Sequence, residues 1–282
     1  MKKIGIIISE KAVSEVLGMV MILSIMMLVI GSILLVGVPM IESGKTRARM
    51  DVSTNSFLSM QNDIEEVVRG PIWIPNDDSG VIGPGPSRET QFELMGGMLS
   101  VLPNNQEIKV QDSRNITIPP SNITYVAGEE RIIYENGAVI RKYEDGEAMM
   151  VSNPLINIYN TDSSNITVSI HSISLNSTLS SSGGEGKTFV ETRLLNYKER
   201  LTTNQKYIII NITSEYPEAW EAFFNTTLKN IGLEPQLGGN ETGYKISGTM
   251  PLQVRIYGNN PDKNKKDIFF SVVESRLDIK IR

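Results

Sequence analysis

An uncharged stretch near the N-terminus places the strongest constraint on this chain. Residues 16–41 read VLGMVMILSIMMLVIGSILLVGVPMI, which is 26 residues without a charged side chain. A helix needs about 20 apolar residues to cross the hydrocarbon core of a bilayer, and a helix in a globular core would show a polar face. Cleaved secretory signals have a shorter apolar region of about 7–15 residues. The sequence therefore predicts a retained transmembrane helix over residues 13–41, surrounded by membrane lipid.

The composition excludes several classes of function. The net charge is −5, whereas a nucleic-acid-binding protein needs a basic face, so no nucleic-acid partner is expected. The chain has no cysteine, which rules out disulfides, cysteine zinc sites and thiol catalysis. Its single histidine, His171, has no nucleophile motif or second ligand beside it. No catalytic, cofactor-binding or metal-binding residue is predicted, and the chain is expected not to be an enzyme.

Residues 42–70 show the periodicity of an amphipathic helix that continues the span. The apolar residues lie at spacings of 7, 3, 4 and 3, and they are Met50, Phe57, Met60, Ile64 and Val67. This stripe predicts packing against a globular head. Two heptads are too few to indicate a coiled-coil stalk instead.

One residue inside the continuous helix should disturb it. Pro39 lies within the predicted span, and proline removes one backbone hydrogen bond of a helix. The sequence therefore predicts a helix kink at Pro39.

Residues 71–282 read as a β-rich domain. Residues 71–88 are dense in proline and glycine and predict a loop, in which Asn76-Asp77-Asp78 lacks the spaced ligands of an EF-hand and reads as an exposed turn. The sequence Glu135-Asn136-Gly137 predicts a hairpin turn. Strands are predicted at residues 91–94, 98–102, 107–110, 131–134, 138–142, 155–159, 165–171, 187–195, 206–212, 252–257 and from 268 to the end.

One late helix interrupts these strands. Ser214 is its expected N-cap, Pro217 lies in its first turn, and Gly232 ends it. Its apolar side, which includes Trp220 and Phe224, is expected to pack on the sheet rather than bind a ligand. The predicted fold class is therefore α+β: a long N-terminal transmembrane and amphipathic helix, followed by a mainly antiparallel β-sandwich-like head with one late helix.

The junction before the apolar stretch resembles the class III signal of archaeal type IV prepilins. It reads Lys11-Ala12-Val13-Ser14-Glu15-Val16-Leu17-Gly18. The resemblance implies a leader over residues 1–12 that a prepilin peptidase removes by cutting between Ala12 and Val13. It also implies that Glu15, near the new N-terminus, assists assembly with other pilin-like subunits. A carboxylate at a helix N-terminus is favoured by the helix dipole.

The head is similar to that of a group of uncharacterised archaeal proteins with a pilin-like N-terminus and a β-rich ectodomain. The similar segments are Ser87-Arg88, the Gly-rich hairpin Leu94-Met95-Gly96-Gly97-Met98, and Ala219-Trp220. No catalytic residues accompany this resemblance.

Glycosylation signals indicate the orientation of the chain. Lysines and arginines flank the apolar stretch on both sides, so the positive-inside rule does not decide. All seven Asn-x-Ser/Thr triplets lie beyond the span, about twice the number expected from composition; they begin at Asn115, Asn122, Asn165, Asn176, Asn211, Asn225 and Asn240. These N-glycosylation candidates favour an extracellular head, although Asn, Ser and Thr also suit turns and strand edges.

Three functions remain open on this reading. The first is a pilin-like subunit of the archaeal cell surface, such as a minor pilin or pseudopilin, with a structural or adhesive role. The second is a single-pass anchored surface protein that binds a surface or glycan ligand and does not polymerise. The third is a tethered glycosidase, which needs two carboxylates about 5–10 Å apart, and no motif indicates such a pair.

Overall fold

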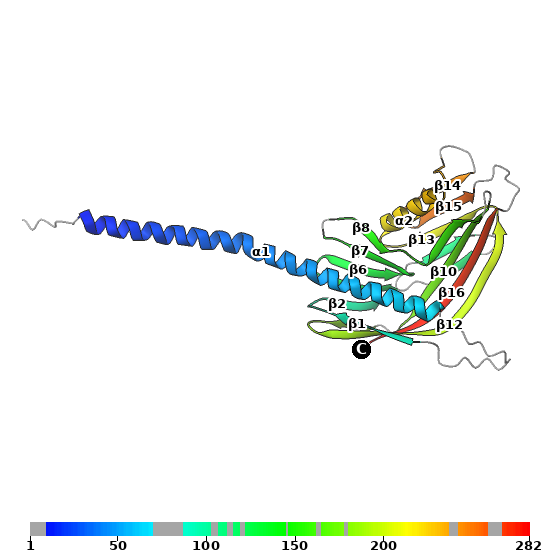
Figure 1. Cartoon of the computed structure of the whole chain (residues 1–282), viewed down its shortest axis with the longest axis horizontal. Helices are drawn as coiled ribbons and strands as arrows, with labels where there is room; N and C mark the ends of the chain where they lie inside the picture. Colours follow the sequence, from blue (N-terminus) through cyan, green and yellow to red (C-terminus); the bar gives the residue numbers. More distant parts are fainter. Residues whose placement is uncertain are drawn as a thin grey trace, which may run out of the picture. The chain divides into compact units, whose positions relative to one another are not determined.

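The computed structural model describes residues 10–69, 87–102, 107–111, 115–118, 122–144, 146–161, 165–177, 180–236, 242–258 and 267–282. The chain divides into two compact units, Met1–Arg49 and Met50–Arg282. The predicted α+β class is confirmed: one long N-terminal helix is followed by mostly antiparallel strands and one late helix (Figure 1).

The first element, α1 (Glu10–Arg69), is one continuous helix of 60 residues. It contains both the apolar stretch and the amphipathic stretch, as predicted, and it starts three residues before residue 13. The helix passes through Pro39, whose nitrogen cannot donate to the carbonyl of Leu35. The first unit ends within this helix at Arg49, and burial of its side chains begins at Met50.

The strands of the second unit form three sheets. The first sheet has the order β1-β12-β16-β10-β9, the second β11-β2-β5-β6-β7-β8, and the third β14-β15-β13-β3-β4. The strands are β1 (Ser87–Glu93), β2 (Met98–Leu102), β3 (Glu107–Gln111), β4 (Asn115–Ile118), β5 (Asn122–Ala127), β6 (Glu130–Glu135), β7 (Ala138–Lys142), β8 (Ala148–Ser152), β9 (Ile156–Asn160), β10 (Ile166–Asn176), β11 (Ser180–Gly183), β12 (Lys187–Gln205), β13 (Ile208–Thr213), β14 (Gly243–Ser247), β15 (Leu252–Gly258) and β16 (Ile268–Ile281).

The first sheet is built on long strands, and its two halves are buried on opposite faces. In β16, Phe270 and Val272 are buried on one face, whereas Leu277 and Ile279 are buried on the other. Because side chains alternate along a strand, the odd separation of five positions between Val272 and Leu277 means that the covered face changes. The strands β10 and β16 pair in parallel along Ile166–Asn176, beside the antiparallel β12 (Figure 1).

Two hydrophobic cores follow from this arrangement. One core lies between the first half of β10 and β16, the third sheet, helix α2 (Pro217–Asn230) and part of the second sheet. The other joins the stripe of α1 from Met50 onwards to the second sheet and the opposite half of the first sheet. Strand β6 contributes to both cores, with Ile133 in the first and Ile132 and Tyr134 in the second. The second sheet therefore separates the two cores.

The predicted hairpin turn is confirmed, but it is not a surface turn. Asn136 and Gly137 join β6 to β7, and both have positive φ, 47° and 86°, which a tight two-residue hairpin requires. Asn136 is buried, and a Cβ atom on Gly137 would lie 3.2 Å from the backbone nitrogen of Leu155. The turn lies inside the domain, where the two cores meet.

The ends of α2 differ in part from the prediction. The N-cap residue is Tyr216 rather than Ser214, because Ser214 accepts a hydrogen bond from the Tyr216 nitrogen outside the helix. Pro217 starts the helix, as predicted. At the other end Gly232 has φ 81°, and the amides of Gly232 and Leu233 donate to the carbonyls of Lys229 and Leu228, a Schellman motif.

Candidate functional site

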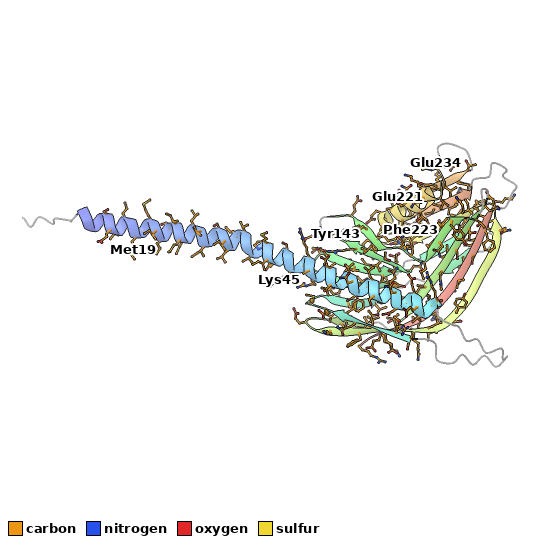
Figure 2. The ribbon with its side chains drawn as sticks, viewed as in Figure 1. Met19, Lys45, Tyr143, Glu221, Phe223 and Glu234 are labelled. Atoms are coloured by element: carbon orange, nitrogen blue, oxygen red, sulfur yellow. The ribbon has the colours of Figure 1, made fainter. Side chains whose placement is uncertain are left out.

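The apolar part of α1 presents its side chains to its surroundings. Large hydrophobic residues from Val16 to Ile41 are 44–79% exposed. Among the residues that the structure describes, α1 is the one helix that is long and apolar enough to cross a bilayer. Figure 2 shows these side chains, Met19 among them, projecting from the helix. The helix thus has the length and composition of a membrane anchor.

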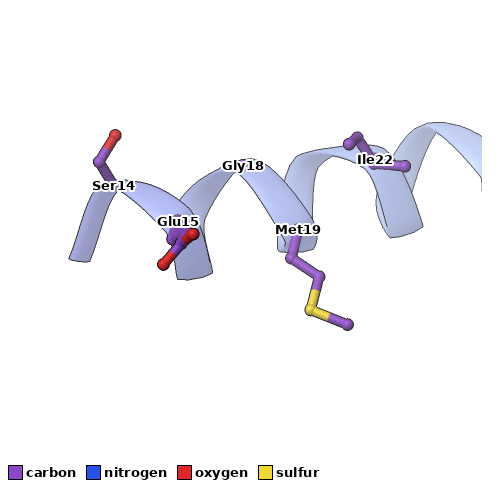
Figure 3. Close-up of a pocket in the computed structure, with 5 residues that line it drawn as sticks. All are labelled: Ser14, Glu15, Gly18, Met19 and Ile22. Carbon is purple, nitrogen blue, oxygen red and sulfur yellow. The ribbon is translucent and has the colours of Figure 1, made fainter. Parts of the chain in front are cut away.

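The predicted processing and assembly residues lie at the start of this helix. Lys11, Ala12 and Val13 belong to the first turn of α1, whose first residue is Glu10. Glu15 is exposed beside Gly18, where the missing side chain leaves a shallow depression lined by Ser14, Met19 and Ile22 (Figure 3). A cut after Ala12 would move Glu15 from the second turn of the helix to the first. In the first turn it would lie among unpaired backbone amides.

The second part of α1 is fixed to the head by a buried apolar stripe. Met50, Phe57, Met60 and Ile64 are completely buried, as the periodicity predicted. The ring of Phe57 meets the ring of Phe92 on β1 edge to face, with 5.2 Å between the centroids. Burial of such side chains stabilises the packing by about 1.5–3 kcal/mol each.

Polar contacts flank this stripe and fix its register. Asp63 accepts a hydrogen bond from Thr90, and Glu66 accepts two from Arg88, so both residues connect α1 to β1. The guanidinium of Arg141 on β7 lies between Asp51 of α1, at 2.7 Å, and Glu130, at 3.3 Å.

A buried polar junction lies around the β6–β7 turn. Gln61 of α1 donates to the carbonyls of Gly137 and Asn153, at 2.7 and 3.0 Å. The side-chain oxygen of Asn136 accepts from the backbone nitrogen of Ile173 on β10. The turn therefore connects α1, β7 and β10.

Glu135, next to this turn, is a buried carboxyl group with few compensating contacts. Its side chain is buried, and its Oε2 accepts a hydrogen bond of 3.0 Å from the Ser214 hydroxyl. The pKa of Glu135 is raised to about 8, mainly by burial and to a smaller extent by the charge of Glu215, whereas hydrogen bonds with Ser214 and Trp220 act to lower it. The sequence did not single out Glu135, because a glutamate beside an Asn-Gly turn normally faces solvent.

His171 is not placed as a catalytic base or a metal ligand. Its Nε2 lies 2.8 Å from the hydroxyl of Ser275, which is completely buried and therefore closed to a substrate. Burial and the charge of Arg69 lower the pKa of His171 to about 4, so the imidazole is neutral at pH 7.

Comparison with known proteins gives one match. A family model described as "Family of unknown function (DUF7289)" matches residues 11–231, well over half of the chain. The chain belongs to this family. No curated protein and no solved structure matches it.

The DUF7289 match covers the features described above. It begins at Lys11, in the predicted cleavage junction. It includes all of the apolar stretch, the buried apolar stripe of α1 from Met50 onwards, Glu135 and α2. It ends at Ile231, so β14, β15 and β16 lie beyond the part of the chain that the family model describes.

Within the described part of this DUF7289 chain, no group of three or more His, Asp or Glu side chains could hold a metal ion. The turn predicted at Asn76-Asp77-Asp78 lies outside the described residues. The aromatic side of α2 is core, as predicted: Trp220 and Phe224 are completely buried and their rings stack.

The seven glycosylation candidates are placed very differently. Asn122 and Asn211 are buried, so a glycan on either side chain would have to displace its packing in the folded head. Asn165 and Asn176, at the two ends of β10, are exposed, and Asn225 on α2 is half-buried. Asn115 begins β4, but its side chain, like all of Asn240, lies outside the described residues.

Proposed function

We propose that this chain is a membrane-anchored cell-surface protein of the type IV pilin-like kind, with a structural or adhesive role and no catalytic activity. The observation that carries the proposal is the single helix α1. The large apolar side chains of its uncharged half are exposed, and the apolar stripe of its amphipathic half is buried from Met50 onwards in a β-rich head. A helix of this kind needs lipid or neighbouring helices around its first half.

The cleavage junction supports the pilin-like part of the proposal. The residues Lys11-Ala12-Val13 precede the apolar stretch, and Glu15 is the acidic residue between the junction and Ile41. An ionisable group at the edge of a membrane span is costly unless it is paired or stays near the interface. In the proposed function, Glu15 pairs with the amino group that cleavage creates on a neighbouring subunit.

N-terminal sequencing and intact-mass measurement of the protein extracted from its native membrane test this proposal. We expect a chain that begins at Val13 and carries glycan mass on Asn165 or Asn176, the exposed candidates. A chain that begins at Met1 without added mass would remove both the processing and the support for an extracellular head.

Substitution of Glu15 separates the pilin-like function from its alternative. We expect Glu15→Ala to abolish recovery of the protein in sheared surface filaments, because the carboxylate that pairs with the next subunit is lost. Glu42→Ala is the matched control, since Glu42 is also exposed and lies just after the apolar stretch. Equal recovery of both variants would favour a single-pass surface binding protein that does not polymerise.

A further inference from the structure

On the half of the first sheet that packs on the first core, several described side chains of the opposite face are exposed, although Thr167 on that face is buried and hydrogen-bonds Thr161. In the strand register, Tyr159 on β9, Thr167 on β10, Phe269 on β16 and Asn204 on β12 form one row. Tyr159 is 50% exposed and Phe269 is 42% exposed. Their sequence neighbours Ile158 and Phe270 point to the other face and are buried in the first core.

The adjacent row on this face is formed by small polar side chains. It consists of Asn157, Ser169 and Ser271, which are exposed or half-buried. We call these six residues the open face: Asn157, Tyr159, Ser169, Asn204, Phe269 and Ser271. At its end, the half-buried rings of His171 and Tyr197 meet edge to face at 6.3 Å.

The open face carries no charged side chain among its six residues, and the neighbouring His171 is neutral at pH 7 because its pKa is about 4. The other exposed part of the same sheet is different. There Arg282 pairs with Glu191 at 2.7 Å, and Asp278 lies within 3.8 Å of both Arg193 and Lys280. The open face therefore differs in charge from this other part of the same sheet.

We propose that the open face binds a neutral oligosaccharide. Aromatic rings stack on the C–H faces of sugar rings, and amide and hydroxyl side chains hydrogen-bond sugar hydroxyls, so exposed aromatics alternating with Asn and Ser match both parts of a sugar. None of the six residues of the open face carries a positive charge that would pair with an anionic glycan, so these residues favour a neutral one. Adjacent strands lie about 4.8 Å apart, so Tyr159 and Phe269, two strands apart, are separated by about 10 Å, which requires more than one sugar unit.

This inference deepens the binding role in the proposed function by giving it a ligand class. It rests on that function only in placing the head outside the cell. Sugar binding by the isolated protein depends on neither cleavage nor filament assembly. Absence of sugar binding would therefore overturn this inference alone, and N-terminal sequencing would still test cleavage separately.

The test uses the full chain in lipid nanodiscs, because detergents with sugar head groups would compete. The probes are maltohexaose, cellohexaose, mannohexaose and chitohexaose, with hexagalacturonate as the acidic comparison, measured by calorimetry and saturation-transfer NMR. We expect at least one neutral hexasaccharide to bind more tightly than the acidic one. Tyr159→Ala and Phe269→Ala should each weaken binding about tenfold.

Phe189→Ala is the matched control, because Phe189 is 37% exposed on β12 of the same sheet but points to the opposite face. Its affinity should stay within about twofold of the unsubstituted chain. The proposal is overturned if no neutral hexasaccharide binds at millimolar concentration, if hexagalacturonate binds at least as tightly, or if Phe189→Ala weakens binding as much as Phe269→Ala. Self-association that Phe269→Ala abolishes, without sugar binding, would assign the face to a second copy of the chain.

Discussion

Glu135→Gln is expected to remove the loss of stability that Glu135 causes in the head as the pH rises from 4.5 to 8. In the folded protein the pKa of Glu135 is about 8, whereas an unburied glutamate has a pKa of 4.5. Within this window the folded chain keeps a proton on Glu135 that the unfolded chain has released. The amide of glutamine resembles the protonated carboxyl group and can still accept the Ser214 hydrogen bond.

The sign of the effect follows from proton linkage. Below pH 4.5 both the folded and the unfolded chain hold a proton on Glu135. The contribution of this group to the free energy of unfolding is therefore at its full value there. As the pH rises, the contribution of Glu135 to the free energy of unfolding falls by about 1.4 kcal/mol per pH unit until the folded group also ionises near pH 8. The loss from Glu135 across the window is about 5 kcal/mol. His171, whose pKa is lowered to about 4, acts in the opposite direction up to about pH 6.5, and its contribution is the same in both chains. At pH 8 the Glu135→Gln chain should therefore be the more stable one, and near pH 4.5 the two should be nearly equal.

Urea unfolding at a series of pH values, followed by tryptophan fluorescence, measures this difference. Glu129→Gln provides the control, because Glu129 is exposed in the turn before β6. Its unfolding free energy should follow the unsubstituted chain at every pH. A Glu135→Gln chain that keeps the full pH slope would show that another group takes up the proton.

Long periodic elements of this fold could be predicted from the sequence, and short ones could not. The apolar stretch and the stripe at Met50, Phe57 and Met60 define α1 because they extend over many turns. Strands β4, β5, β8, β11 and β14 were missed. Four of these have only four or five residues, and β5 is buried on nearly every side chain, so it shows no alternation.

The pairing of the strands could not be predicted from a single sequence either. The parallel pair β10 and β16 joins residues about 100 positions apart, and nothing local indicates that they meet. The change of covered face along β16 depends on two cores formed by distant elements. For the same reason the sequence showed that Tyr159 and Phe269 are apolar, but it could not show that they share a solvent-exposed row.

Some candidate site residues could be predicted from the sequence, whereas the environment of others could not. Glu15 and the cleavage junction could be found because they precede a recognisable apolar stretch. The burial of Glu135, Asn122 and Asn211 could not, because each lies in a local sequence typical of a surface turn or strand edge. Their environment is set by α2 and by strands far away in the chain.

Phe57→Ala is expected to lower the free energy of unfolding of the head by about 3–5 kcal/mol, because it leaves a cavity in a completely buried position. The substitution also removes the edge-to-face contact with Phe92, which connects α1 to β1. Amide hydrogen exchange should consequently rise along α1 from Met50 to Arg69 more than in β10 or β16.

Val52→Ala on the same helix separates loss of docking from a general effect on α1. Val52 is 36% exposed, so its truncation should change the free energy of unfolding by less than about 0.5 kcal/mol. Urea unfolding and hydrogen exchange of both variants in the same bilayer discs measure the difference. Similar, small losses in both would mean that α1 beyond Met50 contributes little to the head, and that the head's second core is stabilised by its sheets. A loss confined to Phe57→Ala would mean that the buried stripe of α1 beyond Met50 stabilises the head, and a rise in exchange confined to α1 would mean that this segment undocks before the sheets unfold.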